Sequence, residues 1–350
     1  MEQTKTVAVI ILSYNGREKY LPDCLSSLAA TNYPQKSLKV LIVDNASSDD
    51  SADYVKNNYP EFTLIQNSKN LGFTEGNNIG YEWAAEQGVD YLVLLNQDTI
   101  VDPKWLNHMV EDAERRDVGA VQAKLMLHPE TNLLNSYGNA IQFLGFGYCN
   151  NYRQLDKPAT EPFEVPYPSG AACLLKMSAL AKTGLFYTRL FAYHEDVDLG
   201  WKLRLAGYKV LLEPKAVVYH KYSFGKAKYK FYYLERNRYF VTLKNYKLAT
   251  LIIFFPAFII MELGMIFYAI KGGWFKEKLK GWGSLLSQLP AILSDRFKTQ
   301  FKLRQVKDKE ILRLYTGSIR FQDVKNPLLT FVANPVMEIY FWLAKKIIFW

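Results

Sequence analysis

Three carboxylates stand within four residues in the segment FAYHEDVDLGWKLRLAGYKV, residues 191–210. Glu195, Asp196 and Asp198 precede apolar residues with helical spacing, so they occupy the first turn of a predicted helix. Acidic residues there usually only complement the helix dipole. Three negative charges so close together are more than the helix dipole requires, and their mutual repulsion raises the pKa of one carboxyl. The segment therefore predicts a general base that works near neutral pH.

A second polar group follows the apolar run YLVLL at residues 91–95. Asn96, Gln97 and Asp98 offer hard oxygens at the end of a rigid strand, which suits Mg²⁺ or Mn²⁺ beside a leaving diphosphate. His220, in the segment VVYHKYSFG, is a further candidate ligand because neutral imidazole binds metals well. The alternatives are a strand-ending turn for the first group and a structural role for the histidine.

Further polar residues could bind a nucleotide. Asp44 ends the run LIVD, where a carboxylate can accept the imide N–H of uracil or thymine; the alternative is a turn or cap role. The segment NLGFTEGNNIG contains Asn70, Gly72 and Asn77 at a predicted helix start, where N–H groups suit a phosphate or ribose. Neither a GxGxxG motif nor a Walker loop follows the first strand, so any nucleotide site uses another device.

Alternating short apolar runs and amphipathic stretches must position these residues. The runs predict buried parallel strands at residues 7–13, 40–44, 62–66 and 91–96, with helices at 17–30, 50–58, 75–87 and 103–116. This alternation predicts an α/β sheet whose ligands lie beyond the carboxyl ends of the strands. Ser13 and Asn15 end the first strand, so they join Asp44, Asn96 and Asp98 at that edge.

The remainder divides by composition. Residues 118 to about 225 are irregular and predict an acceptor-binding half on the same sheet. Residues 1–199 contain 16 Lys and Arg against 25 Asp and Glu, whereas residues 200–350 contain 27 against 9. The three cysteines are widely spaced and form no CxxC pair, which favours a reducing compartment. No signal peptide is recognisable at the N-terminus, so we expect the active domain to stay in the cytoplasm.

Residues 248–270 form an apolar stretch that contains Pro256 and one charge, Glu262, and is bracketed by Lys247 and Lys271. It is long enough to span a bilayer, but the proline and the glutamate favour a helix lying in the interface. Tryptophans and lysines nearby are typical of interfacial segments. We expect monotopic or peripheral attachment to an anionic membrane surface, with a single span as the alternative. Nucleic acid is not an expected partner, because no nucleic-acid module is recognisable.

Taken in order, these segments resemble family 2 glycosyltransferases of the GT-A fold, particularly the rhamnosyltransferase-like branch. The matching motifs cover roughly residues 5–240; they are SYNG, DNASSDDS, NLGFTEGNNIG, LNQDTIVDP, SGAACLLK, FAYHEDVDLGWKLRLAGYKV and HKYSFG. The resemblance implies a Rossmann-like mixed sheet flanked by helices. It further implies a catalytic domain at 1–240, with a nucleotide-sugar half at 1–117 and an acceptor half at 118–240, followed by a membrane-associated helical region at 241–350.

The resemblance also implies roles for residues. Asp44 would bind the pyrimidine base, and Asn70 and Gly72 would contact the nucleoside. Asp98 would bind the metal and the diphosphate. Many relatives carry Asp-x-Asp at this place, whereas this chain has Asn96 in the first position. Asp196 would be the catalytic base of a single displacement that inverts the anomeric carbon. The expected donor is a UDP or dTDP sugar, with rhamnose as one candidate, and the acceptor a saccharide or lipid-linked saccharide.

Several alternatives stay open. Asp198 is the next candidate base, with Glu195 as an auxiliary group, and Arg236 or Arg238 could neutralise the diphosphate if no metal is used. A sugar nucleotidyltransferase would share the sheet and the metal, but SYNGREKYL is a poor phosphate loop. A catalytically silent membrane scaffold is the remaining possibility.

Overall fold

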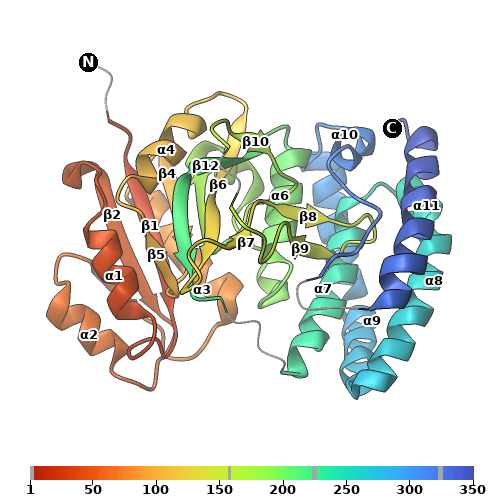
Figure 1. Ribbon diagram of the computed structural model, residues 1–350, viewed down its shortest axis with the longest axis horizontal. Helices are drawn as coiled ribbons and strands as arrows, with labels where there is room; N and C mark the ends of the chain where they lie inside the picture. The colour runs from red at the N-terminus through yellow and green to blue at the C-terminus, as the bar shows by residue number, and fades with distance from the viewer. Residues whose placement is uncertain (1–3, 157–158, 223–226, 322–325) are drawn as a thin grey trace.

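The computed structural model describes residues 4–156, 159–222, 227–321 and 326–350. Its elements run from β1 near the N-terminus to α11 at the C-terminus (Figure 1). The end of the HKYSFG motif, from Ser223 to Gly225, lies outside the described residues.

One mixed sheet of ten strands dominates the described part of the chain, in the order β10-β12-β6-β11-β4-β1-β2-β3, with β5 on β12 and β7 on β6. Strands β1, β2, β3 and β4 are parallel, whereas β11 runs antiparallel between β4 and β6. The strands are β1 Val7–Ser13, β2 Leu38–Asp44, β3 Thr63–Gln66, β4 Tyr91–Leu95, β5 Thr99–Val101, β6 Val118–Leu127, β7 Leu134–Ser136, β10 Phe163–Glu164, β11 Ala172–Lys176 and β12 Lys209–His220; β8 Asn139–Ile141 and β9 Gly147–Cys149 pair separately.

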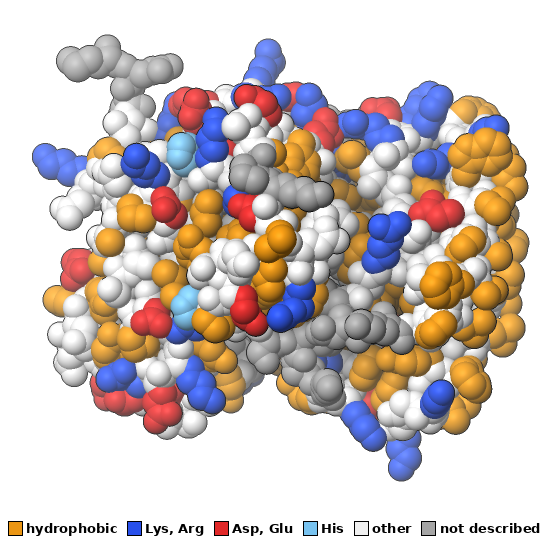
Figure 2. All heavy atoms as spheres, viewed as in Figure 1, with side chains coloured by type: hydrophobic (Ala, Val, Ile, Leu, Met, Phe, Trp, Pro, Cys, Tyr) orange, Lys and Arg blue, Asp and Glu red, His pale blue; other side chains and the backbone are white. Residues whose placement is uncertain are grey.

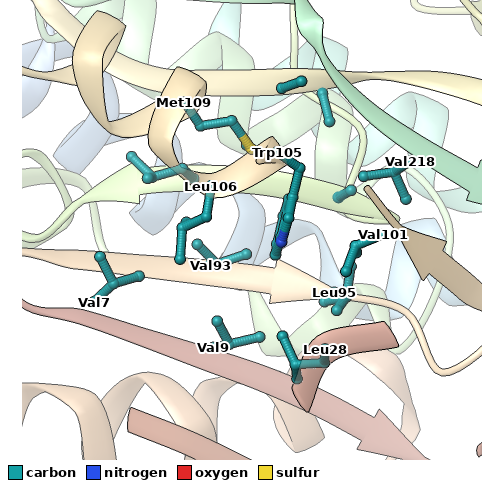
Figure 3. Packing of buried hydrophobic residues seen from close by; sticks show 14 of the residues in the cluster. Val7, Val9, Leu28, Val93, Leu95, Val101, Trp105, Leu106, Met109 and Val218 are labelled. Carbon is teal, nitrogen blue, oxygen red and sulfur yellow. The ribbon is translucent and has the colours of Figure 1, made fainter. Parts of the chain in front are cut away.

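Helices cover both faces of the sheet. They are α1 Leu21–Ala29, α2 Ser51–Asn58, α3 Gly72–Glu86, α4 Trp105–Ala113, α5 Met177–Thr183 and α6 Glu195–Leu205. Alternate residues of β1 enter opposite cores: Val7 and Val9 pack with α1 and α4 (Figure 3), while Ile10 packs on the α3, α5 and α6 side. This alternation is the two-residue period of a strand buried on both faces. The predicted mixed α/β fold with helices on both faces is confirmed.

Two details differ from the sequence prediction. The helix expected from residue 75 begins three residues earlier, at Gly72, and Gly76 and Gly80 lie inside it. A Cβ atom on either glycine would lie 2.5 or 2.3 Å from Leu12 or Ile10 of β1, so both glycines permit close packing of helix on sheet. The third strand, predicted as buried, is the edge of the sheet, so its apolar residues Leu64 and Ile65 pack on opposite cores but stay only partly buried.

The C-terminal helices form a second body beside the sheet (Figure 1). They are α7 Tyr229–Asn245, α8 Leu248–Gly272, α9 Phe275–Lys298, α10 Asp308–Leu312 and α11 Asn334–Ile347. The predicted boundary at residue 240 falls inside α7. A shared core joins Phe143 and Trp201 of the sheet region to Phe254, Ile292 and Phe341 of α8, α9 and α11. The helices therefore pack on the catalytic region through a common apolar interior.

Helix α8 is continuous through Pro256, and among the described residues it alone is long and apolar enough to cross a bilayer. Its Glu262 is ion-paired with Arg238 of α7 and lies 2.9 Å from Nζ of Lys278 of α9. The opposite face of α8 exposes large apolar side chains, and Figure 2 shows such side chains along the edge where α8 and α11 lie. Helix α8 is thus held to the body by the Glu262 ion pairs and by buried Phe254, Ala257 and Met261, while its outer face is apolar and exposed.

Candidate active site

Loops at the carboxyl ends of β1 and β4 are joined by Gln97. Its Oε1 accepts hydrogen bonds from the Ser13 hydroxyl (3.0 Å) and the Tyr14 N–H (3.1 Å). Its amide nitrogen, Nε2, donates to the Tyr14 carbonyl (3.0 Å). Asn15, in a left-handed conformation, accepts from the Ser48 N–H at 2.8 Å. Ser13 and Asn15 therefore shape the edge of the site, and Gln97 connects it to the neighbouring Asp98.

Asp44 ends β2 and is almost fully buried. Its Oδ2 accepts a 3.3 Å hydrogen bond from the Ser47 N–H, whereas its buried Oδ1 has no hydrogen-bond partner. A buried carboxylate oxygen without a donor is costly. Its position at the strand end leaves an acceptor available for an N–H group of a bound molecule.

Asn45 ties the next loop to this edge. Its Nδ2 donates to Asn70 Oδ1 (3.0 Å) and to the Gly72 carbonyl (3.3 Å), and its Oδ1 accepts from the Leu71 N–H (3.0 Å). Asn70 Oδ1 also accepts from the Gly72 N–H at 2.8 Å. The side-chain oxygen Oδ1 of Asn70 thus holds the turn. The backbone of Asn70 and its side-chain nitrogen Nδ2 are left for contact with a ligand.

The start of α3 differs from the anion site that the sequence predicts. The N–H groups of Phe73 and Thr74 both donate to the Phe191 carbonyl, at 2.8 and 3.1 Å, so they are not free for a phosphate. Gly72 has φ +79°, and a Cβ there would lie 2.5 Å from the Phe191 ring. Asn77 is buried and its amide donates to the Phe73 carbonyl, so it braces the helix. This helix start anchors the 191–194 loop.

The structure brings Asp98 and His220 together. Nε2 of His220 lies 3.2 Å from Oδ1 of Asp98, and Nδ1 of His220 lies 2.9 Å from Oδ1 of buried Asn135. With Nδ1–H donating to Asn135, the Nε2 lone pair of a neutral imidazole faces a carboxylate oxygen. Two acceptors at this distance require a proton or a cation between them. No cluster of three or more His, Cys, Asp or Glu side chains that could hold a metal is found in the described residues.

Asp196 lies near the end of β4. Its Oδ2 accepts a 2.9 Å hydrogen bond from the Gly170 N–H, and its buried Oδ1 has no partner. The adjoining Ala171 carbonyl accepts from the Asn96 N–H at 2.9 Å, which links this carboxylate to the predicted metal edge. A Cβ on Gly170 would lie 2.7 Å from Asp196 Oδ1, so only glycine leaves that oxygen room.

Burial raises the pKa of Asp196 to about 6, although the Gly170 hydrogen bond lowers it. Burial, and then the negative charge of Asp196, raises the pKa of Glu195 well above its ordinary value. Asp196 is therefore the carboxyl of the pair that ionises at the lower pH. As a carboxylate it can accept a proton.

A strained loop presents the carboxylate pair. Phe191, Tyr193 and His194 have φ of +63°, +68° and +66°, a region that costs non-glycine residues energy. Fully buried Asn237 of α7 holds it: Nδ2 lies 2.9 Å from the Leu190 carbonyl and 2.8 Å from the carbonyls of Ala192 and Tyr193.

Arg236 and Asp198 have positions other than those predicted. Arg236 is buried, and its Nη2 donates to the carbonyls of Arg189 (2.8 Å) and Leu190 (2.9 Å), so it supports the loop and is not a free cation. Asp198 is buried against Lys244, at 2.6 Å, and Asn245, at 2.9 Å. Although burial opposes ionisation, these partners and Lys202 lower its pKa. Asp198 is thus a structural ion-pair partner of α7 and not a substitute base.

Four residues that shape the site were missed by sequence reasoning: Asn45, Asn135, Gly170 and Asn237. Asn45 and Gly170 stand inside the quoted motifs DNASSDDS and SGAACLLK, so their segments gave a signal. Asn135 and Asn237 gave none, because their partners are distant in sequence and a buried asparagine looks like any polar residue.

Comparison of this chain with known proteins identifies one protein family that it matches. Residues 8–184 match the sequence profile of Glycosyl transferase family 2, which is half of the chain. The poly-beta-1,6-N-acetyl-D-glucosamine synthase of Staphylococcus epidermidis is 27% identical over 220 residues, which cover 62% of this chain and 50% of the synthase. The chain thus spans about half the length of the curated relatives it matches.

Two solved structures cover almost the whole chain. S. aureus TarS in complex with UDP gives a TM-score of 0.53 at 17% identity, over 97% of this chain and 90% of that one. Mannosyltransferase PcManGT from Pyrobaculum calidifontis, in complex with GDP-Man and Mn²⁺, gives 0.52 at 16% identity, over 99% and 87%. These likenesses establish the fold, and with the profile match they show that the chain belongs to glycosyl transferase family 2.

Proposed function

We propose that this family 2 enzyme transfers a sugar from a pyrimidine nucleotide diphosphate donor to an acceptor hydroxyl with inversion. The observation that carries the proposal is Oδ1 of Asp196, a buried carboxylate oxygen without a hydrogen-bond partner, beside which Gly170 leaves room that a Cβ atom would fill. Its raised pKa matches a base that must accept a proton near neutral pH. A single base without a neighbouring nucleophile suits one direct displacement.

Unpartnered Oδ1 of Asp44 supports the donor assignment, because the imide N–H of uracil or thymine supplies the missing donor. The Asn70–Gly72 turn, fixed by Asn45, would lie against the nucleoside. Between the candidate sugars, the similarity to poly-N-acetylglucosamine synthases favours UDP-N-acetylglucosamine over dTDP-rhamnose as the first donor to test.

Asp98 and His220 fit a divalent cation. Their facing acceptor atoms, 3.2 Å apart, form a two-ligand set that a diphosphate and water can complete. A bound Mg²⁺ or Mn²⁺ would neutralise the charge that develops on the leaving diphosphate. Asn135 would fix the imidazole tautomer, so that Nε2 and not Nδ1 faces the cation.

The reaction follows from these positions. Asp196 Oδ1 accepts the proton of the acceptor hydroxyl, whose oxygen forms a bond to the anomeric carbon. The bond from that carbon to the diphosphate breaks on the opposite face, so the configuration inverts. The Gly170 N–H holds Oδ2 and orients the other oxygen toward the acceptor.

We also propose that the protein attaches to the cytoplasmic face of a membrane without spanning it. Glu262 supports this, since its pairing with Arg238 and Lys278 holds α8 against the body, and a span would break these contacts. The bare stripe Leu248, Ile252, Phe255, Ile259 and Leu263 would lie among acyl chains. The basic second half of the chain suits the anionic lipids of the cytoplasmic leaflet.

The donor assignment is tested by measuring binding and transfer with UDP-N-acetylglucosamine, dTDP-rhamnose and GDP-mannose. Transfer from a uracil or thymine nucleotide, lost in Asp44→Asn, supports the proposal; use of GDP-mannose alone contradicts it. The anomer of the product, read by NMR, tests inversion. Release of free pyrophosphate from a sugar phosphate and a nucleoside triphosphate would indicate a nucleotidyltransferase. Absence of sugar transfer from every donor would indicate a catalytically silent scaffold.

A further inference from the structure

A cavity of about 700 Å³ lies between the start of α8, the end of α9 and the π-helical turn Thr299–Leu303. Its lining includes four basic side chains, Lys247, Arg296, Arg304 and Lys307, and no acidic one. Two carboxylates lie beside it: buried Asp308 pairs with Arg304 at 2.8 Å, and Glu310 accepts from the Lys307 N–H at 3.4 Å. The cavity therefore holds a surplus of positive charge.

That surplus is built into the fold. Arg296 Nη1 donates to the carbonyls of Leu243 and Tyr246, which fixes the guanidinium beside Arg304. Burial, and then the charge of Arg304, lowers the pKa of Arg296, which marks two like charges held close together. Lys247 and Lys307 form no ion pair within the described ranges. Fixed like charges of this kind are stabilised by an anion.

Two apolar stripes meet at the same cavity. On α8, exposed Ile259, Phe255, Ile252 and Leu248 follow one another toward it, and Leu248 is part of its wall. On α9 and the turn after it, exposed Leu286, Leu289, Leu293, Phe297 and Phe301 do the same, and the last three line the wall. An anion bound here would thus have continuous apolar surface beside it, which suits an amphiphile better than a free ion.

The cavity is distant from the catalytic carboxylate. Gln305, which lines it, donates its N–H to the carbonyl of Leu205, the last residue of α6, whereas Asp196 is in the first turn. Leu205 is nine residues beyond Asp196, which at about 1.5 Å per residue is roughly 14 Å. A phosphate bound in the cavity is therefore too far away to contact Asp196.

We infer that this cavity binds the phosphate headgroup of an anionic bilayer lipid, with the acyl chains lying along the α8 and α9 stripes. The inference rests on the proposed membrane attachment and adds a specific lipid site to it. The bound molecule is a bilayer lipid and not the sugar acceptor, because the cavity lies at the end of α6 that is far from Asp196.

The test compares binding of the full-length protein to phosphatidylcholine vesicles with and without phosphatidylglycerol. The Lys247→Gln/Lys307→Gln variant should lose the preference for phosphatidylglycerol by about fivefold per lysine, roughly 25-fold in all. The matched control, Lys302→Gln/Lys309→Gln, removes the same charge from exposed lysines nearby in the sequence that do not line the cavity and form no ion pair within the described ranges. Its preference should stay within about twofold of the unchanged protein, since only cavity residues contact the headgroup.

Equal losses in the two double variants would mean diffuse surface attraction and would overturn the inference. Absence of binding to every vesicle would instead overturn the proposed membrane attachment. A second measurement uses soluble dihexanoyl phosphatidylglycerol and inorganic phosphate. The short-chain lipid should raise the melting temperature of the unchanged protein saturably and that of the cavity variant less. An equal rise with inorganic phosphate would identify a free-anion site and contradict the lipid assignment.

Discussion

Nε2 of His220, at the end of β12, lies 3.2 Å from Oδ1 of Asp98, which follows β4. Asn135 Oδ1, 2.9 Å from Nδ1, fixes the ring in this orientation. Asn135→Leu should therefore lower the apparent affinity for Mn²⁺ in UDP binding by roughly 10–100-fold, the usual effect of losing such a partner. Asn135→Asp keeps an acceptor and should retain most of it. Titration of Mn²⁺ by calorimetry checks both, and equal affinities would remove Asn135 from this role.

Asp196→Asn should lower transfer by about 10²–10⁴-fold while donor binding stays within a few-fold, because only the proton acceptor is removed. Glu195→Gln is the matched control, since it makes the same change at the adjacent carboxyl, whose pKa burial and the charge of Asp196 raise well above its ordinary value. We expect the control to keep activity. Single-turnover rates at saturating donor decide the matter; if the two variants lose equally, the base is not Asp196.

The pKa of Asp196, about 6, sets two pH dependences. Transfer should rise through pH 6 and then level off as the carboxylate forms. Stability should move the other way: a folded-state pKa above the ordinary 3.8 means a contribution present below pH 3.8 and lost through pH 6. Asp196→Asn should thus be more stable than the unchanged protein above pH 6, by at most about 3 kcal/mol at about 1.4 kcal/mol per pKa unit. Thermal unfolding at pH 4 and pH 8 tests this, and an unchanged difference would contradict it.

Gly170→Ala should impair catalysis without removing any functional group. The added Cβ would stand 2.7 Å from Asp196 Oδ1, so the carboxylate must shift, and displacement of about 1 Å can cost 10²-fold in rate. Gly264→Ala, on α8, meets nothing within 4 Å and serves as the control. The melting temperature of each variant separates misfolding from misplacement, and full activity of Gly170→Ala would refute the need for glycine.

Asn237→Leu should destabilise the protein and abolish transfer together. The two amide hydrogens are shared among three loop carbonyls. The Leu190 carbonyl keeps a donor in Arg236, but those of Ala192 and Tyr193 lose this donor, and a buried acceptor left unsatisfied costs about 1–3 kcal/mol. Chemical denaturation measures the loss, and limited proteolysis should open the chain near residues 189–194 first. A variant as stable as the original would show that the loop holds its left-handed residues without α7.

Much of the site was readable from sequence because strand ends are local features. Asp44 and Asp98 directly follow apolar runs, and parallel strands bring such ends to one edge. Asp196 and Asp198 show where this reading stops. Residues two apart on a helix point to opposite sides, so one faces the site while the other is buried against Lys244 of α7. The partner came from a helix that the sequence placed in a different region.

The C-terminal helices show a similar limit. Their apolar character is plain from composition, but the pairing of Glu262 with Arg238 and Lys278 depends on three helices meeting. Because of the shared core, removal of these helices would expose Phe143 and Trp201, so point substitutions on the intact chain are the better test of membrane attachment.

The Asn237 contacts have an evolutionary consequence. The amide recognises main-chain carbonyls of Leu190, Ala192 and Tyr193, and every amino acid supplies the same carbonyl. The side chains of Ala192 and Tyr193, unlike that of the core residue Leu190, can therefore change while the backbone path that presents Asp196 stays the same. Such an arrangement lets the side chains beside Asp196 diversify by point mutation without rebuilding the loop. For protein engineers, Tyr193 is accordingly the first position to randomise, with Asn237 kept constant.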